Sequence, residues 1–219
     1  MKGIVEFRKN VRDDYRETFR KLALEQAPDT LMIACSDSRV VPNLFASADP
    51  GDMFVVRNVG NLVAPCGADG FTVGDESEPA AIEFAVENLG VRDIIVCGHS
   101  ECGAMRAIAD GTEKVKLEHL KSWLRQGEPA LKLLKEGRVL DGRLAPHNQL
   151  SQINVLQQLK HLKTYPDIRK RLDRGTLRLH GWWFNIARAD VHSYDADSDS
   201  FVLIDEAQAE KILKQLSLP

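Results

Sequence analysis

Two short segments of the sequence carry side chains that could bind a metal ion. The first, ACSDSRVVP, places Cys35, Asp37 and Arg39 at alternate positions directly after the apolar run LMIA. The second, GHSECG, contains His99 and Cys102 and follows the apolar run DIIVC. Two thiolates and one imidazole form a ligand set that zinc uses in catalytic sites, where a fourth position stays open. The pattern therefore predicts one metal site built from both segments.

The local geometry of each segment decides which side chains can meet. If the first segment stays extended, Cys35, Asp37 and Arg39 point to the same side, because side chains alternate along a strand. If the second segment enters a helix, His99 and Cys102 lie three residues apart on one face. Both segments follow apolar strands, and open parallel sheets bind ligands at the carboxyl ends of their strands. We therefore expect the two segments to converge at one edge of a sheet.

Short, nearly continuous apolar runs predict the strands that position these segments. Runs of this kind suit parallel strands that are covered on both faces. A helix is expected over residues 77–90, with apolar side chains at helical spacing and Gly90 as its stop. The strand, helix, strand order indicates a βαβ unit. The predicted strands are 31–35, 53–57, 93–97, 176–184 and 200–205.

The rest of the sequence is mainly helical in pattern. Residues 5–25 mix charged side chains with apolar ones close to helical spacing, which predicts an amphipathic helix whose apolar face needs a partner surface. Helical patterns also dominate residues 103–173, and no repeat or linker divides the 219 residues. We therefore predict one α/β domain over residues 1–219, with a central, mainly parallel β-sheet flanked by helices and an N-terminal helical arm.

Composition and charge limit the classes of partner. The formal net charge is -3 at pH 7, so neither nucleic acid nor a membrane surface is an expected partner. Charged residues recur every few positions in residues 1–21, which excludes the apolar region of a signal peptide. No segment approaches the roughly 20 apolar residues that span a bilayer. A cytoplasmic location is expected by default.

The two metal-binding segments resemble the C-x-D-x-R and H-x-x-C motifs of the β-class carbonic anhydrases. The resemblance covers most of the chain, because it continues through three further segments: RNVGN (57–61), AAIEFAV (80–86) and HGW (180–182). It implies a zinc enzyme, a lyase, that catalyses the reversible hydration of CO2 to bicarbonate and a proton through a zinc-bound hydroxide. It also implies one Zn²⁺ per subunit, held by three side chains: Cys35, His99 and Cys102.

The resemblance further implies roles for residues around the metal. Asp37 and Arg39 form the catalytic pair, in which the guanidinium lowers the pKa of the carboxyl group and fixes its orientation. Gln26 is expected to donate a hydrogen bond to substrate or bicarbonate. The remaining substrate-binding positions are three apolar side chains, suited to an uncharged molecule, and one glycine: Phe54, Val59, Phe84 and Gly103.

Comparison within that family predicts the subtype and the assembly. In the bacterial subtype that bicarbonate switches off, a tryptophan, an arginine and a tyrosine form a non-catalytic bicarbonate pocket. The corresponding residues here are Met32, Arg57 and Phe184, so both hydrogen-bonding aromatic side chains are missing. The resemblance thus implies the plant-like subtype, in which bicarbonate does not drive Asp37 onto the zinc. It also implies a homodimer or tetramer in which residues 1–28 pack on a partner subunit.

The pattern leaves two alternatives open. An enzyme of the same fold could hydrolyse carbonyl sulfide or carbon disulfide, and the sequence separates these substrates from CO2 poorly. A closed structural zinc site would recruit Cys97 as a fourth ligand, which leaves Asp37 and Arg39 without a purpose. The proton shuttle is also left open, because three histidines lie in polar helical stretches and are expected to be solvated: His119, His147 and His161.

Overall fold

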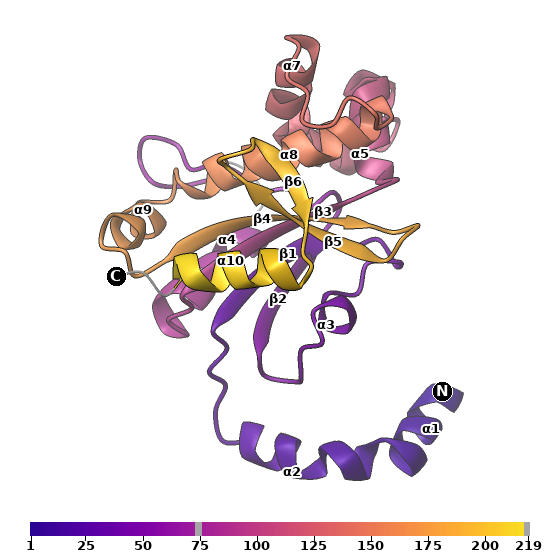
Figure 1. Cartoon of the computed structure of the whole chain (residues 1–219), viewed down its shortest axis with the longest axis vertical. Helices are drawn as coiled ribbons and strands as arrows, with labels where there is room; N and C mark the ends of the chain where they lie inside the picture. The colour runs from indigo at the N-terminus through magenta and orange to yellow at the C-terminus, as the bar shows by residue number, and fades with distance from the viewer. Residues whose placement is uncertain (73–75, 217–219) are drawn as a thin grey trace.

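A six-stranded β-sheet forms the centre of the protein (Figure 1). The computed structural model describes residues 1–72 and 76–216, and within them the strand order is β2-β1-β3-β4-β5-β6. β2, β1, β3 and β4 run parallel, whereas β5 and β6 are antiparallel to their neighbours. The strands are β1 (Thr30–Cys35), β2 (Met53–Asn58), β3 (Asp93–His99), β4 (Arg178–Asn185), β5 (Asp190–Asp195) and β6 (Ser200–Leu203). The predicted α/β fold with a mainly parallel sheet is confirmed.

Helices occupy most of the connections between the strands. The α-helices are α1 (Lys2–Asn10), α2 (Arg12–Leu22), α3 (Pro42–Phe45), α4 (Ser77–Glu83), α5 (Gly103–Asp110), α6 (Glu118–Leu124), α7 (Glu128–Lys135), α8 (Pro146–Leu162), α9 (Pro166–Asp173) and α10 (Glu206–Leu216). A π-helical turn, η1 (Phe84–Asn88), continues α4, and two 3-10 turns, η2 (Thr112–Lys114) and η3 (Arg125–Gly127), flank α6.

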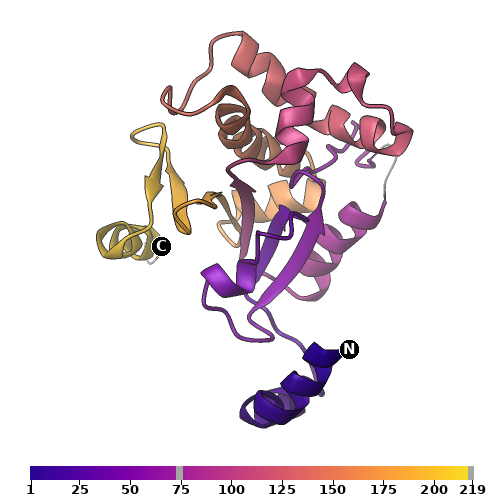
Figure 2. The same cartoon turned by 90° about the vertical axis from the view of Figure 1, so that its right-hand side faces the viewer.

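The two faces of the sheet are covered unequally. Apolar side chains of β1 and β3 on one face pack with α4, η1, α8 and α9 in a single core cluster. The other face carries a smaller cluster around Met32, Ile95 and Phe184, against which Phe45 of α3 packs. At the edges of this second cluster Met53 and Trp182 are only partly buried. In Figure 2 the sheet lies between α4, in magenta, and α10, in yellow.

Three elements differ from the sequence prediction. β5 was not predicted, because its sequence DVHSYD is too polar to resemble the apolar runs of the parallel strands. The helix expected over residues 77–90 consists of α4 and the π-helical turn, and it ends before Gly90, whose φ of +69° confirms the expected stop. The single helix expected over residues 5–25 is broken at Val11 into α1 and α2.

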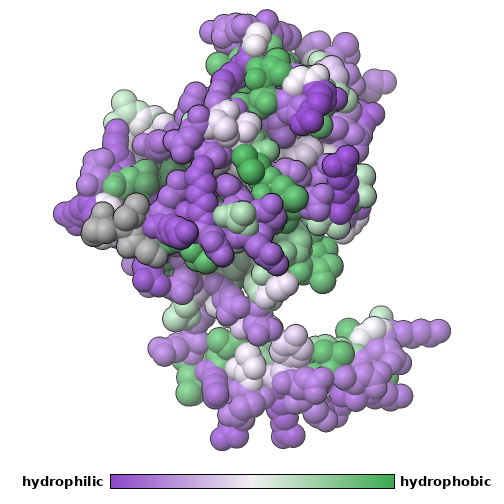
Figure 3. Space-filling model, in the orientation of Figure 1, coloured by the Kyte–Doolittle hydropathy of each residue, from purple (hydrophilic) through white to green (hydrophobic). Residues whose placement is uncertain are grey.

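The two N-terminal helices form an arm that extends away from the sheet (Figure 1). Neither α1 nor α2 contains a buried residue. Large apolar side chains on this arm are exposed, among them Ile4, at 71%, and Phe7, at 42%. Figure 3 shows these hydrophobic areas interrupting an otherwise hydrophilic arm surface. Across residues 1–72 and 76–216, no helix combines the length and the apolarity needed to cross a bilayer.

Candidate metal centre

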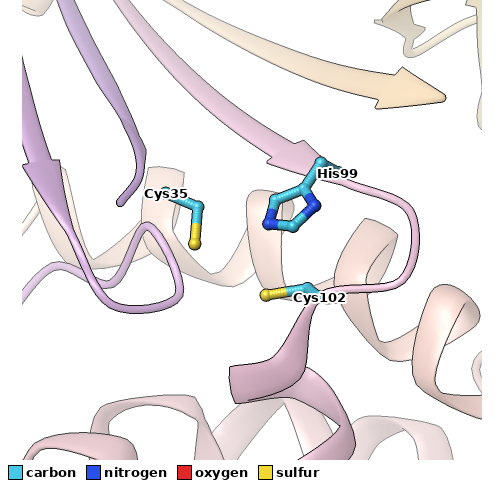
Figure 4. Close-up of side chains that lie close together, drawn as sticks. All are labelled: Cys35, His99 and Cys102. Carbon is cyan, nitrogen blue, oxygen red and sulfur yellow. The ribbon is translucent and has the colours of Figure 1, made fainter. Parts of the chain in front are cut away.

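Three buried side chains converge where two neighbouring strands end (Figure 4). β1 and β3 are adjacent and parallel, so their last residues, Cys35 and His99, lie at the same edge of the sheet. Cys102 caps the N-terminus of α5. The ligand atoms of the three residues all lie within 4.8 Å of one another. The metal-binding group expected from the sequence is therefore assembled by the fold.

The hydrogen bonds of His99 prepare one ring nitrogen for a metal. Nδ1 lies 2.8 Å from the carbonyl oxygen of Ser100, and because a carbonyl oxygen only accepts, Nδ1 carries the ring proton. Nε2 is buried and finds no hydrogen-bond partner in the described part of the chain. Such an orphaned atom is rare in folded proteins unless a ligand satisfies it. With two sulfur atoms beside it, this nitrogen fits Zn²⁺ with a fourth position left open.

The two thiols differ in how readily they lose their protons. A hydrogen bond from Cys102 lowers the pKa of Cys35, and the N–H of Gly60 lowers it further by donating to Cys35 Sγ at 3.3 Å. The same contact with Cys35, together with burial, raises the pKa of Cys102. The pair thus holds one thiolate readily, and the second proton leaves when a cation takes its place.

Asp37 and Arg39 form an ion pair beside this group. Arg39 donates from Nε to Asp37 Oδ1 at 2.9 Å and from Nη2 to Oδ2 at 2.7 Å, and its own N–H also reaches Oδ1. The hydrogen bond from this guanidinium holds the pKa of the Asp37 carboxyl group well below its usual range. Asp37 therefore stays ionised throughout the neutral pH range, as the sequence predicted.

Both segments form turns rather than the extended or helical geometries considered for them, although the side chains still meet. β1 ends at Cys35, and the chain then turns, since the N–H of Val40 donates to the carbonyl of Asp37 at 3.0 Å. His99 and Cys102 are likewise joined by a turn, in which Glu101 has a φ of +55°, and α5 begins only at Gly103. Both turns are shaped by hydrogen bonds between their main chain and side chains from elsewhere, which the local sequence pattern does not reveal.

Arg57 holds the first turn in place. From β2 it donates to three main-chain carbonyls: Cys35 at 3.1 Å and 3.0 Å, Asp37 at 2.7 Å and Val40 at 2.7 Å. The guanidinium therefore fixes the backbone that carries both Cys35 and Asp37. The sequence placed Arg57 at the arginine position of the family's bicarbonate pocket, and its pattern did not show these contacts with the turn.

Helix α8 forms hydrogen bonds with the loop after β2 and with the end of β3. Its Ser151 hydroxyl donates to the carbonyl of His99 at 2.8 Å. Asn154 donates to the carbonyl of Gly60 at 3.3 Å. The carbonyl of Val63 bonds to the ring of His161 at 2.7 Å. One helix thus holds both the loop after β2 and the loop after β3.

Two of the expected histidine environments are wrong. His161 is buried rather than solvated, and burial lowers its pKa. The ring of His147 is mostly enclosed and lies 3.1 Å from the carboxylate of Glu101. His119 is exposed on α6, as predicted. The polar sequences around His147 and His161 concealed the fact that both belong to the buried side of α8.

Only part of the expected substrate pocket lies beside the metal-binding group within one chain. Val59 follows β2 directly, next to Gly60, and Gly103 follows Cys102 with open space around its Cα. Phe54 pairs with Leu31 in the sheet, four residues before Cys35, which places it about 13 Å from that end of the strand. Two further residues lie at the same distant end: Phe84, whose ring centroid is 5.9 Å from that of Phe54, and the exposed Gln26, which precedes β1.

Cys97 does not join the metal-binding group. Its side chain belongs to the apolar cluster on the opposite face of the sheet from Cys35 and Cys102. Burial raises its pKa to about 12, and its thiol lies 3.5 Å from the carbonyl oxygen of Gly98. Within the described residues the group therefore has three members, and a closed structural site with Cys97 as fourth ligand is not formed.

Comparisons with known proteins agree with this geometry. A family model described as carbonic anhydrase matches residues 30–191. A carbonic anhydrase of Pseudomonas aeruginosa is 39% identical over 204 residues, which cover 93% of this chain and 90% of that protein. The solved structure of the β-carbonic anhydrase CcaA has a TM-score of 0.83 and 38% identity, with 92% of this chain and 96% of that chain covered. One of two tetrameric β-carbonic anhydrases from Sordaria macrospora has a TM-score of 0.68 and 32% identity, with 83% and 88% covered.

Proposed function

This chain is a β-class member of the carbonic anhydrase family, and we propose how its own residues support the reversible hydration of CO2 to bicarbonate and a proton. The observation that carries the proposal is the free Nε2 of His99, buried between two cysteines and beside an ionised carboxylate. Cys35, His99 and Cys102 would hold Zn²⁺, which when bound would supply a nucleophile from water at near-neutral pH.

Asp37 orients the attacking oxygen in this proposal. Its carboxylate is ionised and can accept a hydrogen bond from the nucleophile, which aims the lone pair of that oxygen at the carbon of CO2. Arg39 occupies one edge of the carboxylate through two hydrogen bonds and so keeps Asp37 off the metal. Two thiolates would cancel the charge of Zn²⁺ and weaken its effect as a Lewis acid, so this orienting contact would matter more than it would beside neutral ligands.

The variant Arg39→Lys tests the role of the bidentate contact. Lysine keeps the positive charge but cannot hold both carboxylate oxygens, so we expect kcat to fall about tenfold while zinc content stays unchanged. Arg143→Lys is the matched control, because Arg143 donates the same two hydrogen bonds, from Nε and Nη2, to the carboxylate of Asp141 away from the metal-binding group. Full activity in Arg39→Lys would contradict the proposal.

We infer that bicarbonate does not switch this enzyme off. Three observations support this subtype. Met32 is fully buried, and Phe184 is 7% exposed and stacks on Phe45 with ring centroids 4.8 Å apart, so neither offers a hydrogen bond to an anion. Arg57 already donates to three carbonyl oxygens of the turn that carries Asp37. Binding an anion at Nε or Nη2 of Arg57 would require breaking these bonds.

Activity as a function of pH and bicarbonate tests the subtype. We expect CO2 hydration between about pH 8.5 and 7 to show the same pH profile at low and high bicarbonate, apart from product inhibition. A steep additional loss of activity at pH 7 that depends on bicarbonate would contradict the inference. Met32→Trp combined with Phe184→Tyr supplies the comparison, since it introduces the missing hydrogen-bonding side chains.

We also propose that the chain acts as a homo-oligomer of single-domain subunits, with residues 1–28 packed on a partner. Most apolar side chains of α1 and α2 stay exposed within one chain, among them Ile4, Phe7 and Phe19. Gln26, Phe54 and Phe84 lie at the end of β1 that is distant from Cys35, so they would contact substrate only at the metal centre of a second copy. Partial exposure of Met53 on the less covered sheet face supports such an interface.

A further inference from the structure

Asn148 lies in the first turn of α8 and contacts Glu101 with both ends of its side-chain amide. Its Oδ1 accepts a hydrogen bond from the N–H of Glu101 at 2.7 Å, and its Nδ2 donates to Glu101 Oε1 at 2.8 Å. The asparagine is 7% exposed, so neither contact is readily replaced by water. Neither residue belongs to the metal-binding group or to the ion pair of Asp37 and Arg39.

We propose that Asn148 is a positioning residue for CO2 hydration, which acts by fixing Glu101 and, through Glu101, the guanidinium of Arg39. The inference rests on the proposed role of Asp37 and Arg39. It assigns to α8 a contribution to the orientation of the carboxylate, in addition to its support of the loops. Asn148 itself touches neither the metal-binding group nor the carboxylate that it helps to orient.

The backbone of Glu101 needs an external constraint. Its φ of +55° lies in the left-handed region, which residues other than glycine rarely adopt. Asn148 bonds to both the N–H and the carboxylate of Glu101 and so holds the residue in this conformation. Arg106 and His147 contact the other carboxylate oxygen, at 2.6 Å and 3.1 Å. Of these three partners, only Asn148 bonds to the main chain of Glu101 in the described structure.

This conformation turns the carbonyl group of Glu101 toward Arg39. The carbonyl oxygen accepts a hydrogen bond from Arg39 Nη2 at 3.1 Å, and the same nitrogen donates to Asp37 Oδ2 at 2.7 Å. Arg39 is otherwise half exposed, with 48% of its side chain accessible, so this bond limits how far the guanidinium can swing. Contacts therefore run without a break from Asn148 through Glu101 and Arg39 to Asp37.

The zinc-loaded variant Asn148→Ala tests the proposal. We expect kcat to fall about tenfold with KM and zinc content unchanged, because the orientation of the carboxylate is lost while the metal ligands remain. Hydrogen exchange should become faster in the peptide that spans residues 99–103, since the N–H of Glu101 loses its acceptor. Gln149→Ala is the matched control on the same helix turn, because Gln149 donates instead to the carbonyl of Leu144.

A second substitution separates positioning from a merely structural role. Glycine adopts the left-handed conformation without steric cost, so adding Glu101→Gly to Asn148→Ala should bring kcat back to within about threefold of the wild type. Hydrogen exchange at residue 101 should stay fast in this double variant, because the acceptor is still missing. Damage to the packing of α8 would not be repaired by a glycine at position 101.

Three results would overturn the inference: unchanged kcat in Asn148→Ala, loss of zinc together with activity in that variant, or no recovery in the double variant. Failure of this inference is distinguishable from failure of the proposed function. If only this inference fails, Arg39→Lys still loses activity. If the proposed function fails, Arg39→Lys keeps its activity.

Discussion

The pattern D-x-R occurs four times in this chain, and the two copies that lie outside helices fold the same way. In Asp37-Ser38-Arg39 and in Asp141-Gly142-Arg143, the arginine N–H and Nε both bond to one carboxylate oxygen and Nη2 bonds to the other. The spacing alone does not predict this contact, because the other two copies, Asp14-Tyr15-Arg16 and Asp167-Ile168-Arg169, lie in helices α2 and α9. The chemistry of the contact depends on its surroundings, since only the copy with Asp37 lies beside Cys35.

Gly60 is a residue whose backbone the metal centre requires. Its φ is +88°, and a Cβ at this position would lie 2.9 Å from the Cβ of Ala104. We expect Gly60→Ala to destabilise the protein by about 2 kcal/mol and to weaken zinc binding, because the N–H that donates to Cys35 Sγ must shift.

Urea denaturation and zinc titration of this variant measure both effects. Gly142→Ala is the control, because φ at Gly142 is not in the left-handed region and the nearest atom to an added Cβ, in Val139, is 3.8 Å away. We expect the control to change stability by less than about 0.5 kcal/mol. Equal behaviour of the two variants would show that Gly60 is not constrained as described.

At the scale of elements, the sequence predicted what depends on local pattern and missed what depends on distant contacts. The strands β1 and β3 are mainly apolar and were predicted, whereas the polar strand β5 was not. The metal ligands were identified because their spacing places them at strand ends. The roles of Arg57 and Asn148 were not, because each bonds to loops that are 17 to 47 residues away in the chain.

A partly buried charge network joins β3 to β4 at the end of the sheet opposite the metal centre. Asp93 accepts hydrogen bonds from Arg178 at 2.8 Å and 2.7 Å, and His180 lies 2.7 Å from it. Burial raises the pKa of Asp93, but the hydrogen bonds from His180 and Arg178 outweigh burial and hold it at about 2. The folded protein thus binds this proton less readily than the unfolded chain does, and the network stabilises the fold only while Asp93 is ionised.

The stability difference between the wild type and Asp93→Asn should therefore depend on pH. We expect Asp93→Asn to lower the free energy of unfolding by about 1 to 2 kcal/mol at pH 7 and by nearly the same amount at pH 5. The decrease should become smaller as the pH falls from about 4 toward 2. Urea denaturation of both proteins at matched zinc concentration measures this stability difference. Asp29→Asn is the control, since Asp29 and Arg92 form an exposed pair. A difference that stays constant from pH 7 to pH 3 would contradict this account.

At the scale of the whole molecule, one chain leaves apolar surface exposed on its arm and keeps some residues predicted to bind substrate away from the metal centre. The sequence predicted that the amphipathic arm needs a partner, and the structure shows an arm with no buried residue. The sequence could not predict which of the expected pocket residues would lie together, because the distance from Gln26 to Cys35 is set by the length and direction of β1.

Mixed oligomers test whether Gln26 serves the metal centre of a partner. Cys35→Ser and Gln26→Ala subunits, co-expressed with different tags, should form a heterodimer with one intact site, because the first subunit supplies Gln26 and the second supplies the metal ligands. We expect about half the activity of a wild-type dimer. Activity no higher than half that of the Gln26→Ala homodimer would place Gln26 outside the partner's site.

The central claim is that the cysteines and histidine hold zinc while Asp37 directs the reaction. CO2 hydration measured by stopped flow, with zinc content determined for each protein, tests it in Cys35→Ser, Asp37→Asn and the control Asp141→Asn. We predict that Cys35→Ser loses zinc and activity, that Asp37→Asn keeps zinc and loses activity about 100-fold, and that the control keeps both. Full activity in zinc-loaded Asp37→Asn, or in zinc-free Cys35→Ser, would contradict the account.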